Sequence, residues 1–505
     1  MTSSLKPRKN QLPNSLESIT PLSANELAAL QDLETIEDLA INERRGYKPE
    51  ELPELGVDLS IEQKPEFLSD PLCFECGQWI FAQSLNFIQP YAPTKPTQPI
   101  LNSILIRADQ AQQSVTLTVT DLVATATATF KAKVESSGEI ALPIDRIATV
   151  IRTCPIQGQI RMWTGSNPDG EISGHQGEPL PSSHFNAQIA HIYDSEDGYT
   201  EIYGQAGSEY PNLANISNRS IFLPVKVVLA ALQSVLPASS SDNTKVPLNA
   251  VRWQLNPQTE ILECHATDGH QVAITQVKTK TTNRRSRKKT EQSLNLPKIE
   301  ATIPAKLLRE LVKTLERSKV NASFRITADD STQKVKFELK EDELQRSLTI
   351  RCYDAPFPNC PELLARYDFV HTASFDKAGL TTRLERLNAL VDKEVDGLIL
   401  QFDARQQKAR LTIERDFGKG MQTIAAQIPE EIDAFGIKLN IKYLKNAVNA
   451  LRSSRIDCIV DSASTPCKIQ SSGETDIPDL DITTTYFVAP QYDQSRQKLR
   501  EVKRP

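Results

Sequence analysis

The stretch ECHATDGHQVAIT, residues 263–275, is part of a pattern that occurs more than once in the chain. Its Thr267-Asp268 repeats a Thr120-Asp121 that lies 147 residues earlier. The same offset relates Leu101-Asn102 to Leu248-Asn249 and Tyr210-Pro211-Asn212 to Phe357-Pro358-Asn359, and one further step relates Ala250 to Gly397. A long internal period predicts tandem copies of one domain, which we place at residues 72–218, 219–366 and 367–492.

Each copy is predicted to have two halves, because a short apolar strand leading into a helix occurs six times, starting at residues 74, 142, 223, 303, 375 and 439. In the fourth segment, Leu307, Leu308, Leu311 and Leu315 recur at helical spacing. The segments between the helices alternate apolar and polar residues, as strands do. The predicted fold class is α+β, with helices on one face of antiparallel sheets.

Composition agrees with a globular chain of about three domains, since it has 505 residues, of which 39% are hydrophobic and 24% charged. No apolar run is long enough for a membrane span, and the start of the chain lacks the apolar stretch of a signal peptide. The eight scattered cysteines fit a reducing compartment. We therefore expect a cytoplasmic protein without a membrane partner.

Charge is unevenly distributed along the chain. The six predicted helical segments carry 15 Lys or Arg against 6 Asp or Glu, although the whole chain has a net charge of −6. Cations concentrated on equivalent helices of an acidic protein indicate a shared basic surface, suited to contacts with phosphates that ignore base sequence. The alternative is that these are ordinary solvated helix faces, and the first helix indeed has no cation.

The two ends of the chain differ from the repeats. Residues 1–70 hold 7 Lys or Arg and 14 Asp or Glu, so segment 1–71 is predicted to be an acidic, largely disordered extension with one helix capped by Ser23. The apolar face of that helix either docks on the main body or a partner, or packs only loosely. Residues 493–505 form a tail that ends in KLREVKRP.

Six stretches carry a family resemblance, in order and with matching spacing. They are PTKPTQPILNSILIRAD, LTVTDLVATATATFKAKV, ECHATDGHQVAIT, APFPNCPELL, LNIKYLKNAVNAL and YFVAPQY. Over about residues 72–492 the chain resembles the bacterial DNA polymerase III beta subunit, the replication sliding clamp. The resemblance implies three tandem DNA-clamp domains, a ring of two chains joined head to tail, and basic helices that line the hole.

The resemblance also implies a function and a set of partners. The expected role is a non-catalytic processivity subunit that encircles double-stranded DNA without sequence preference and tethers the replicative polymerase. The expected partners are the DNA polymerase III alpha subunit, the clamp loader, other proteins with clamp-binding peptides, and a second copy of the chain. No cofactor and no metal are expected.

Site residues are carried over by matching this chain to the family pattern. The partner-peptide pocket is predicted at Leu248, Thr267, Gly269, His270, Val272, Pro358, Leu363, Phe487, Val488, Ala489 and Pro490. The DNA-facing cations are predicted to include Lys95, Arg146, Arg152, Lys226, Lys306, Arg309, Lys313, Lys377, Lys442 and Lys445. The dimer interface is predicted to pair the strand around Tyr199 and Ile202 with the third domain near Ala389 and Leu390. From the residues alone, Thr267-Asp268-Gly269 is more readily read as a plain turn between strands.

The chain departs from the family pattern at four places. Gln271 and Glu362 stand where clamps usually have arginine, and both the 70-residue extension and the C-terminal tail are unusual. The tail either covers the pocket as an internal competitor or reaches toward DNA. These departures indicate a divergent clamp, with a paralogue that recruits proteins but is rarely loaded on DNA as the alternative.

Two inserts enlarge the repeats. Residues 166–198 are predicted to be a long Gly/Pro/Ser loop, and residues 278–289 hold seven cations and no acid. The basic insert either contacts DNA backbone at the entrance of the ring or is a solvated loop without a ligand.

Metal and catalytic sites are not predicted. Cys73 and Cys76 have no second pair at zinc-site spacing, and His175, His184 and His191 have no helix to align them. The chain has no glycine-rich phosphate loop and no G-x-S-x-G motif. A DNA-acting enzyme remains a third reading, which a metal-dependent nuclease assay on nicked plasmid would test.

Overall fold

The computed structural model describes residues 72–491 except 167–187, 197, 214–215, 217–219, 257, 260, 279–298, 320–321, 330–332, 392–396, 416–417, 430–435 and 476–481. All described residues belong to one compact unit that spans Leu59–Pro505. The predicted extension 1–71, the tail 493–505, His175, His184 and most of both inserts lie outside the described residues.

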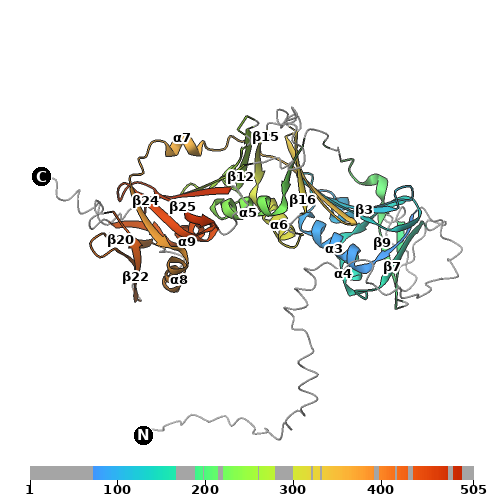
Figure 1. Ribbon diagram of the computed structural model, residues 1–505. Helices are drawn as coiled ribbons and strands as arrows, with labels where there is room; N and C mark the ends of the chain where they lie inside the picture. Colours follow the sequence, from blue (N-terminus) through green and yellow to red (C-terminus); the bar gives the residue numbers. More distant parts are fainter. Residues whose placement is uncertain are drawn as a thin grey trace, which may run out of the picture. The chain divides into compact units, whose positions relative to one another are not determined.

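Antiparallel strands form three sheets (Figure 1). The five-stranded sheet runs in the order β5 (Lys133–Ser136), β1 (Leu72–Gly77), β7 (Gln159–Ser166), β8 (Gln188–Asp194), β9 (Tyr199–Tyr203). The nine-stranded sheet runs β10 (Gln205–Ala206), β6 (Gly138–Pro143), β2 (Ser103–Asp109), β3 (Ser114–Thr120), β4 (Ala124–Lys131), β18 (Leu344–Arg351), β17 (Lys334–Glu341), β16 (Ser323–Asp329), β11 (Ser220–Pro224). The twelve-stranded sheet runs β15 (Ile299–Pro304), β12 (Ala250–Asn256), β13 (Ile261–Thr267), β14 (Gln271–Lys278), β26 (Ile482–Val488), β25 (Cys467–Thr475), β24 (Ser453–Val460), β19 (His371–Asp376), β22 (Gly418–Gln427), β21 (Lys408–Arg415), β20 (Gly397–Asp403), β23 (Gly436–Asn440).

The helices lie in pairs against these sheets, α3 beside α4, α5 beside α6 and α8 beside α9 (Figure 1). Their bounds are α3 Gln78–Ile88, α4 Ile144–Thr153, α5 Val225–Val235, α6 Ala305–Glu316, α7 Cys360–Leu364, α8 Lys377–Asn388 and α9 Ile441–Ala450. Short 3₁₀ turns are η2 Gln89–Tyr91, η3 Pro99–Asn102, η5 Gly207–Glu209 and η6 Leu236–Ala238. None of the described helices is long and apolar enough to cross a membrane.

All six predicted strand-to-helix segments are confirmed: β1 runs into α3, β6 into α4, β11 into α5, β15 into α6, β19 into α8 and β23 into α9. Side chains cap the last two helices. Asp376 Oδ2 accepts from the Gly379 N–H at 2.6 Å, and Asn440 Oδ1 accepts from the Lys442 N–H at 2.8 Å. These caps satisfy N–H groups that have no partner within the helix, so each helix begins at the end of its strand.

Two strand pairs join the tandem domains into continuous sheets. β4 of the first domain pairs with β18 of the second over Ala124–Phe130, and β14 of the second pairs with β26 of the third over Gln271–Val277. The apolar core continues across both joints and includes Phe130, Trp253 and Tyr486, which are at most 1% exposed. The predicted fold class is confirmed, whereas the exact domain borders at 218/219 and 366/367 remain predictions.

The predicted loop 166–198 is wrong at its C-terminal end. Residues Gln188–Asp194 form β8, which pairs with both β7 and β9. Ala190 and Ile192 alternate into the core, while His191 stacks on Trp163 with ring centroids 5.5 Å apart. The Gly/Pro/Ser composition of the preceding residues concealed this short alternation in the sequence.

Candidate functional site at the second sheet joint

The turn between β13 and β14 is built by two side chains. Thr267 Oγ1 donates to the Gln271 carbonyl at 2.7 Å and accepts from the Gly269 N–H at 3.1 Å. Asp268 Oδ1 accepts from the N–H groups of His270 and Gln271 at 2.9 and 3.0 Å. Gly269 has φ +94°, a conformation that favours glycine.

The first domain contains the same turn between β3 and β4. Thr120 Oγ1 donates to the Ala124 carbonyl at 2.8 Å, and Asp121 Oδ1 accepts from the Val123 N–H at 2.9 Å. Leu122 takes the place of Gly269, also with positive φ (69°), and its side chain is 51% exposed. The Thr-Asp pair is therefore a structural feature of the repeat, and Gly269 with His270 distinguishes the second joint.

An apolar surface lies beyond this turn. Val272 stands directly opposite Phe487 in the β14–β26 ladder, and the Ala489 N–H donates to the His270 carbonyl at 2.8 Å. A Cβ atom at Gly269 would meet no atom closer than Leu248 Cδ1, at 4.0 Å. The structure thus brings together six predicted pocket residues from the second and third domains.

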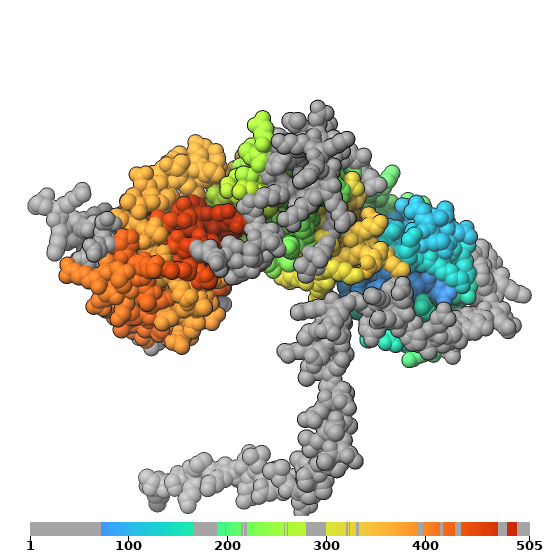
Figure 2. Space-filling model, viewed as in Figure 1, coloured from blue at the N-terminus to red at the C-terminus, as the bar shows by residue number. Residues whose placement is uncertain are grey.

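The remaining predicted pocket residues have different roles. Thr267 and Val488 are buried, so they support the site from below. Pro490 forms a bridge to Leu439 in β23. Pro358 and Leu363 belong to the α7 segment, which stands at the surface (Figure 2), where the Leu363 side chain is 47% exposed.

Phe369, in the connection after α7, was not predicted as a site residue. Its ring packs against Phe487 with centroids 5.4 Å apart, and Lys468 Nζ lies 5.8 Å from its centre. Glu362, which replaces the usual arginine, is exposed and its Oε2 accepts from Asn359 Nδ2 at 2.8 Å. We define the apolar surface as Leu248, Val272 and Phe487 together with Leu363, which belongs with Glu362 to α7.

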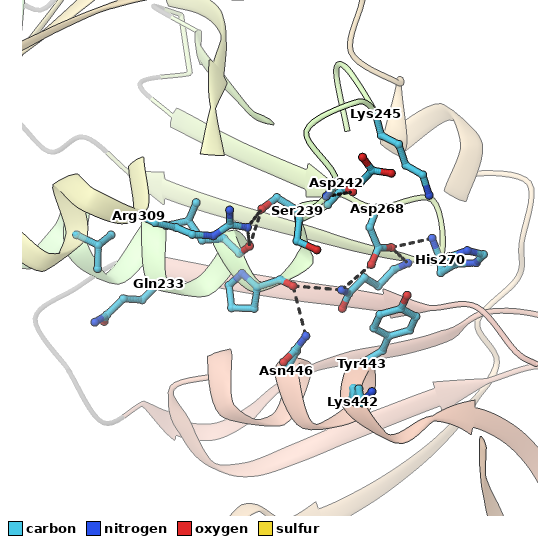
Figure 3. A pocket seen from close by; sticks show the side chains of 16 residues that line it. Gln233, Ser239, Asp242, Lys245, Asp268, His270, Arg309, Lys442, Tyr443 and Asn446 are labelled. Carbon is cyan, nitrogen blue, oxygen red and sulfur yellow. Dashed lines mark hydrogen bonds between the residues drawn. The ribbon is translucent and has the colours of Figure 1, made fainter. Parts of the chain in front are cut away.

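A polar cavity of about 680 Å³ lies on the helix side of the same turn (Figure 3). It shares only His270 with the predicted pocket. Its lining comprises Gln233, Leu236, Pro237, Ser239, Ser240, Ser241, Asp242, Lys245, Asp268, His270, Gln271, Arg309, Val312, Lys442, Tyr443 and Asn446. These residues come from α5, η6 and the following loop, the 267–271 turn, α6 and α9.

Hydrogen bonds across the cavity floor connect the second and third domains. The Pro237 carbonyl accepts from Gln271 Nε2 at 3.2 Å and from Asn446 Nδ2 at 3.3 Å. Arg309 Nη2 donates to Ser239 Oγ at 2.6 Å, and burial lowers the pKa of this guanidinium. The ring of His270 lies nearly parallel to that of Tyr443, at 15° and 6.3 Å between centroids.

Most of this lining was not predicted from the sequence. The loop between α5 and β12 has no apolar periodicity and no motif, so its only signal was a run of small polar residues, Ser239–Ser241. Gln271, which stands where clamps usually have arginine, is 2% exposed. The Gln271 side chain is shorter than the arginine usual at this position, and its Nε2 donates to the Pro237 carbonyl and to Asp268 Oδ2.

The second joint also contains a buried tyrosine. Tyr486 is fully buried, and its hydroxyl donates to the Ser234 carbonyl in α5 at 2.5 Å. Tyr486→Phe removes this bond and should lower the stability by about 1 kcal/mol. Scanning calorimetry at neutral pH measures this loss.

The same variant gives a pH dependence. Burial raises the pKa of Tyr486, so the stability that its neutral form contributes is fully present below the ordinary tyrosine pKa of about 10 and is lost as pH rises above it. The difference in Tm between wild type and Tyr486→Phe should therefore be smaller at about pH 10.5 than at about pH 8, with the decrease confined to the alkaline end of that range. A difference that is constant with pH would contradict the assignment.

The predicted DNA-facing cations lie mostly on the paired helices. Arg146 and Arg152 are on α4, Lys226 on α5, Lys306, Arg309 and Lys313 on α6, Lys377 on α8, Lys442 and Lys445 on α9, and Lys95 between η2 and η3. Some are engaged within the protein: Arg152 donates to Asn86 at 3.1 Å, Lys313 pairs with Glu310 at 2.9 Å, and Lys377 donates to the Leu451 carbonyl at 2.5 Å. Arg146, Lys306 and Lys442 are exposed.

Comparison with known proteins matches this architecture. Residues 222–359 match the family model described as DNA polymerase III beta subunit, central domain. The beta sliding clamp of Synechocystis sp. is 28% identical over 417 residues, covering 82% of this chain and 98% of the relative. The beta sliding clamp of Synechococcus elongatus is 25% identical with the same coverages.

Solved structures agree on the fold. The DNA polymerase sliding clamp from Bacillus subtilis superposes with a TM-score of 0.67 at 18% identity, covering 84% of this chain and 99% of that chain. The DNA polymerase III subunit beta from Pseudomonas aeruginosa gives 0.65 at 14% identity, covering 83% and 100%. A sliding clamp is a non-catalytic replication subunit that works with DNA and its polymerase, as the sequence predicts. The chain is therefore similar to bacterial beta sliding clamps over nearly their whole length, and divergent from them in sequence.

Proposed function

We propose that two copies of the chain close head to tail around duplex DNA and tether the DNA polymerase III alpha subunit, the clamp loader and other partners through a peptide bound at the apolar surface. The observation that carries this proposal is the pattern of the sheet joints. Within the described residues, both joints use equivalent strands: β4 with β18, and β14 with β26. The repeat leaves a third equivalent pair, β22 and β9.

β22 and β9 both have an edge available for a second chain. Among the described strands, β9 pairs only with β8 and ends its sheet. β22 pairs with β21 along its length, but with β19 at only two residues, Ser374↔Gln427 and Phe375↔Ala426. Exposed edges are normally covered or blunted, and pairing β22 with β9 of another copy would cover both.

Side chains near these edges suit such a joint. On β9, Tyr199 is 46% exposed, while Ile202 is buried in the core. On the third domain, Leu390 packs on β22 so closely that a Cβ atom at Gly420 would lie 2.6 Å from Leu390 Cδ1. Met421 beside it is 56% exposed. This apolar group agrees with the predicted interface at Tyr199, Ile202, Ala389 and Leu390.

The peptide part of the proposal is tested at Leu363, the most exposed member of the apolar surface. Leu363→Ala should weaken binding of a Gln-Leu-Ser-Leu-Phe peptide about tenfold, because buried apolar anchors carry most of the affinity of such complexes. Fluorescence polarisation measures the affinity. Ile156→Ala, which trims another exposed aliphatic side chain (75% exposed), serves as the control. Equal weakening by both variants would refute the site.

Encirclement is tested by topology. Protein loaded by a clamp loader and ATP should stay on nicked circular DNA and leave once that DNA is cut to a linear form, since retention comes from enclosure rather than affinity. Equal retention on both forms would refute encirclement. A protein that binds partner peptides but is never retained on circles would instead be a recruitment paralogue, which the replacement of the usual arginines by Gln271 and Glu362 favours.

A further inference from the structure

We propose that α7 and the connector around it, residues 352–370, are held on the second domain by an uncharged His265, so that protonation of this side chain in mild acid loosens them. The proposal goes beyond the proposed function, because it concerns the chain alone and is measured without DNA, peptide or polymerase. Its link to the candidate site is that α7 carries Leu363, a member of the apolar surface.

His265 points away from the core and is nevertheless buried. On the same strand, β13, the side chains of Leu262, Cys264 and Ala266 are at most 1% exposed and belong to the core. Neighbouring side chains of a strand point to opposite faces, so Glu263 and His265 stand on the outer face of the sheet. His265 is only 2% exposed there, so other atoms of the protein cover it from outside the sheet.

The connector lies against this outer face. It leads from β18 to β19 and contains α7 (Figure 1). The Tyr353 N–H donates to the Thr302 carbonyl at 2.8 Å. Thr302 stands opposite Arg252 in the β12–β15 ladder, and Arg252 stands opposite His265 in the β12–β13 ladder. The connector is therefore tied to the sheet within two strands of His265.

α7 itself is buried on this side through one residue. Cys360 is 1% exposed, whereas Leu363 is 47% exposed. Burial raises the pKa of the Cys360 thiol to about 11, and the positive charge of Arg252 acts against this rise. Such an effect requires the thiol and the guanidinium to be close. Arg252 thus lies near both Cys360 and His265, and α7 sits beside the imidazole.

The surroundings of His265 favour its neutral form. Neither ring nitrogen has a hydrogen bond with a described residue. Burial lowers the pKa of His265, and the cation of Arg252 lowers it as well, while Glu263, whose Oε2 lies 3.3 Å from Nε2, acts in the opposite direction. An imidazolium in this position would be a buried charge beside another cation, which is costly.

The neighbouring carboxylates are already engaged. Glu300 Oε1 pairs with Arg252 Nη2 at 2.7 Å, and Glu263 Oε1 accepts from Gln276 Nε2 at 2.7 Å. The residue directly opposite His265 on β14 is the apolar Ile274. The titratable and charged groups that face His265 are, by element, Arg252 from β12, Glu263 from β13, Glu300 from β15 and the Cys360 thiol from α7.

Protonation therefore opposes the docked state of α7. When α7 leaves the sheet, His265 becomes hydrated and its pKa returns toward the ordinary value of about 6.5. Because the docked state has the lower pKa, its stability is fully present above about pH 6.5 and is lost as pH falls below that value. At pH 5.5 the open form is about 90% protonated, so the docking constant should fall up to about tenfold between pH 7.5 and pH 5.5.

Hydrogen exchange followed by mass spectrometry on the full-length protein measures this docking. After correction for intrinsic exchange rates, the protection of amides in residues 352–364 should fall up to about tenfold from pH 7.5 to pH 5.5, whereas amides of β20 and β21 in the third domain should keep theirs. His265→Gln, which cannot take up the proton, should remove the fall. His371→Gln, at the start of β19, is the matched control and should retain it. A wild-type protein without the fall, or an equal fall in His265→Gln, would overturn the proposal.

A second variant keeps His265 and tests the sign of the effect. Glu263→Gln removes the carboxylate 3.3 Å from Nε2 and so disfavours the imidazolium further in the docked state. The fall in protection should then be at least as large as in wild type. A smaller fall would contradict the role of His265, even if His265→Gln did not fold. Because exchange is measured on the chain alone, neither result depends on the proposed function.

Discussion

A protein with Leu390→Glu and Met421→Glu should sediment as a monomer of 56.2 kDa, whereas the wild type should sediment at twice that mass. Leu390 packs on β22 at Gly420, and the Met421 side chain on that strand is 56% exposed. Two carboxylates there would be desolvated beside Glu201 of β9 in the proposed joint. Loss of two apolar contacts together with like-charge repulsion should raise the dimer dissociation constant about a hundredfold or more.

The control for this prediction is Ile156→Glu, which places one carboxylate on a 75% exposed apolar position in the loop between α4 and β7, outside both strands. Analytical ultracentrifugation at micromolar concentration measures the mass of each protein. The monomeric variant should also lose retention on circular DNA. A wild-type protein that is monomeric, or a double variant that remains dimeric, would contradict the proposed joint.

Neutralising Arg146, Lys226, Lys306 and Lys442 together should weaken binding to linear duplex DNA about ten- to thousandfold near 0.1 M salt. Each lost phosphate contact should lower the slope of log K against log salt by about 0.9. The four residues lie on α4, α5, α6 and α9, the helices on which the sequence concentrates cations. The affinity measured at several salt concentrations gives the slope.

The matched control neutralises Lys131, Lys340, Lys408 and Arg410, three lysines and one arginine that are exposed on strands β4, β17 and β21. It changes the net charge equally but should leave the slope near that of wild type. If both quadruple variants reduce the slope by the same amount, binding depends on net charge alone and the helices are not the DNA-facing surface.

The sequence by itself determined the local elements, because their causes are local. The alternation in Ala124–Phe130 and the leucines of α6 define which faces are buried, and Asp376 and Asn440 cap helices from within their own segments. Thr267 and Asp268 form the turn through hydrogen bonds to residues at most four positions away. The same Thr-Asp pair at Thr120 could therefore be recognised in the sequence as a repeat of this turn. The strand β8 was missed because its short alternation follows a long polar insert.

Which strands pair, and which side chains lie between them, depends on the three-dimensional fold. The alternation of apolar and polar residues shows which face of a strand is buried, but not which other strand it pairs with. Val272 and Phe487 are brought opposite each other by backbone hydrogen bonds, which leave no pattern in the side chains of the sequence. The pairing places α5, α6, α9 and the 239–245 loop around one cavity, although these segments are far apart in the sequence. Gln271 illustrates the difference: its position in the motif was evident, but its burial under Pro237 follows from a contact with a residue 34 positions away.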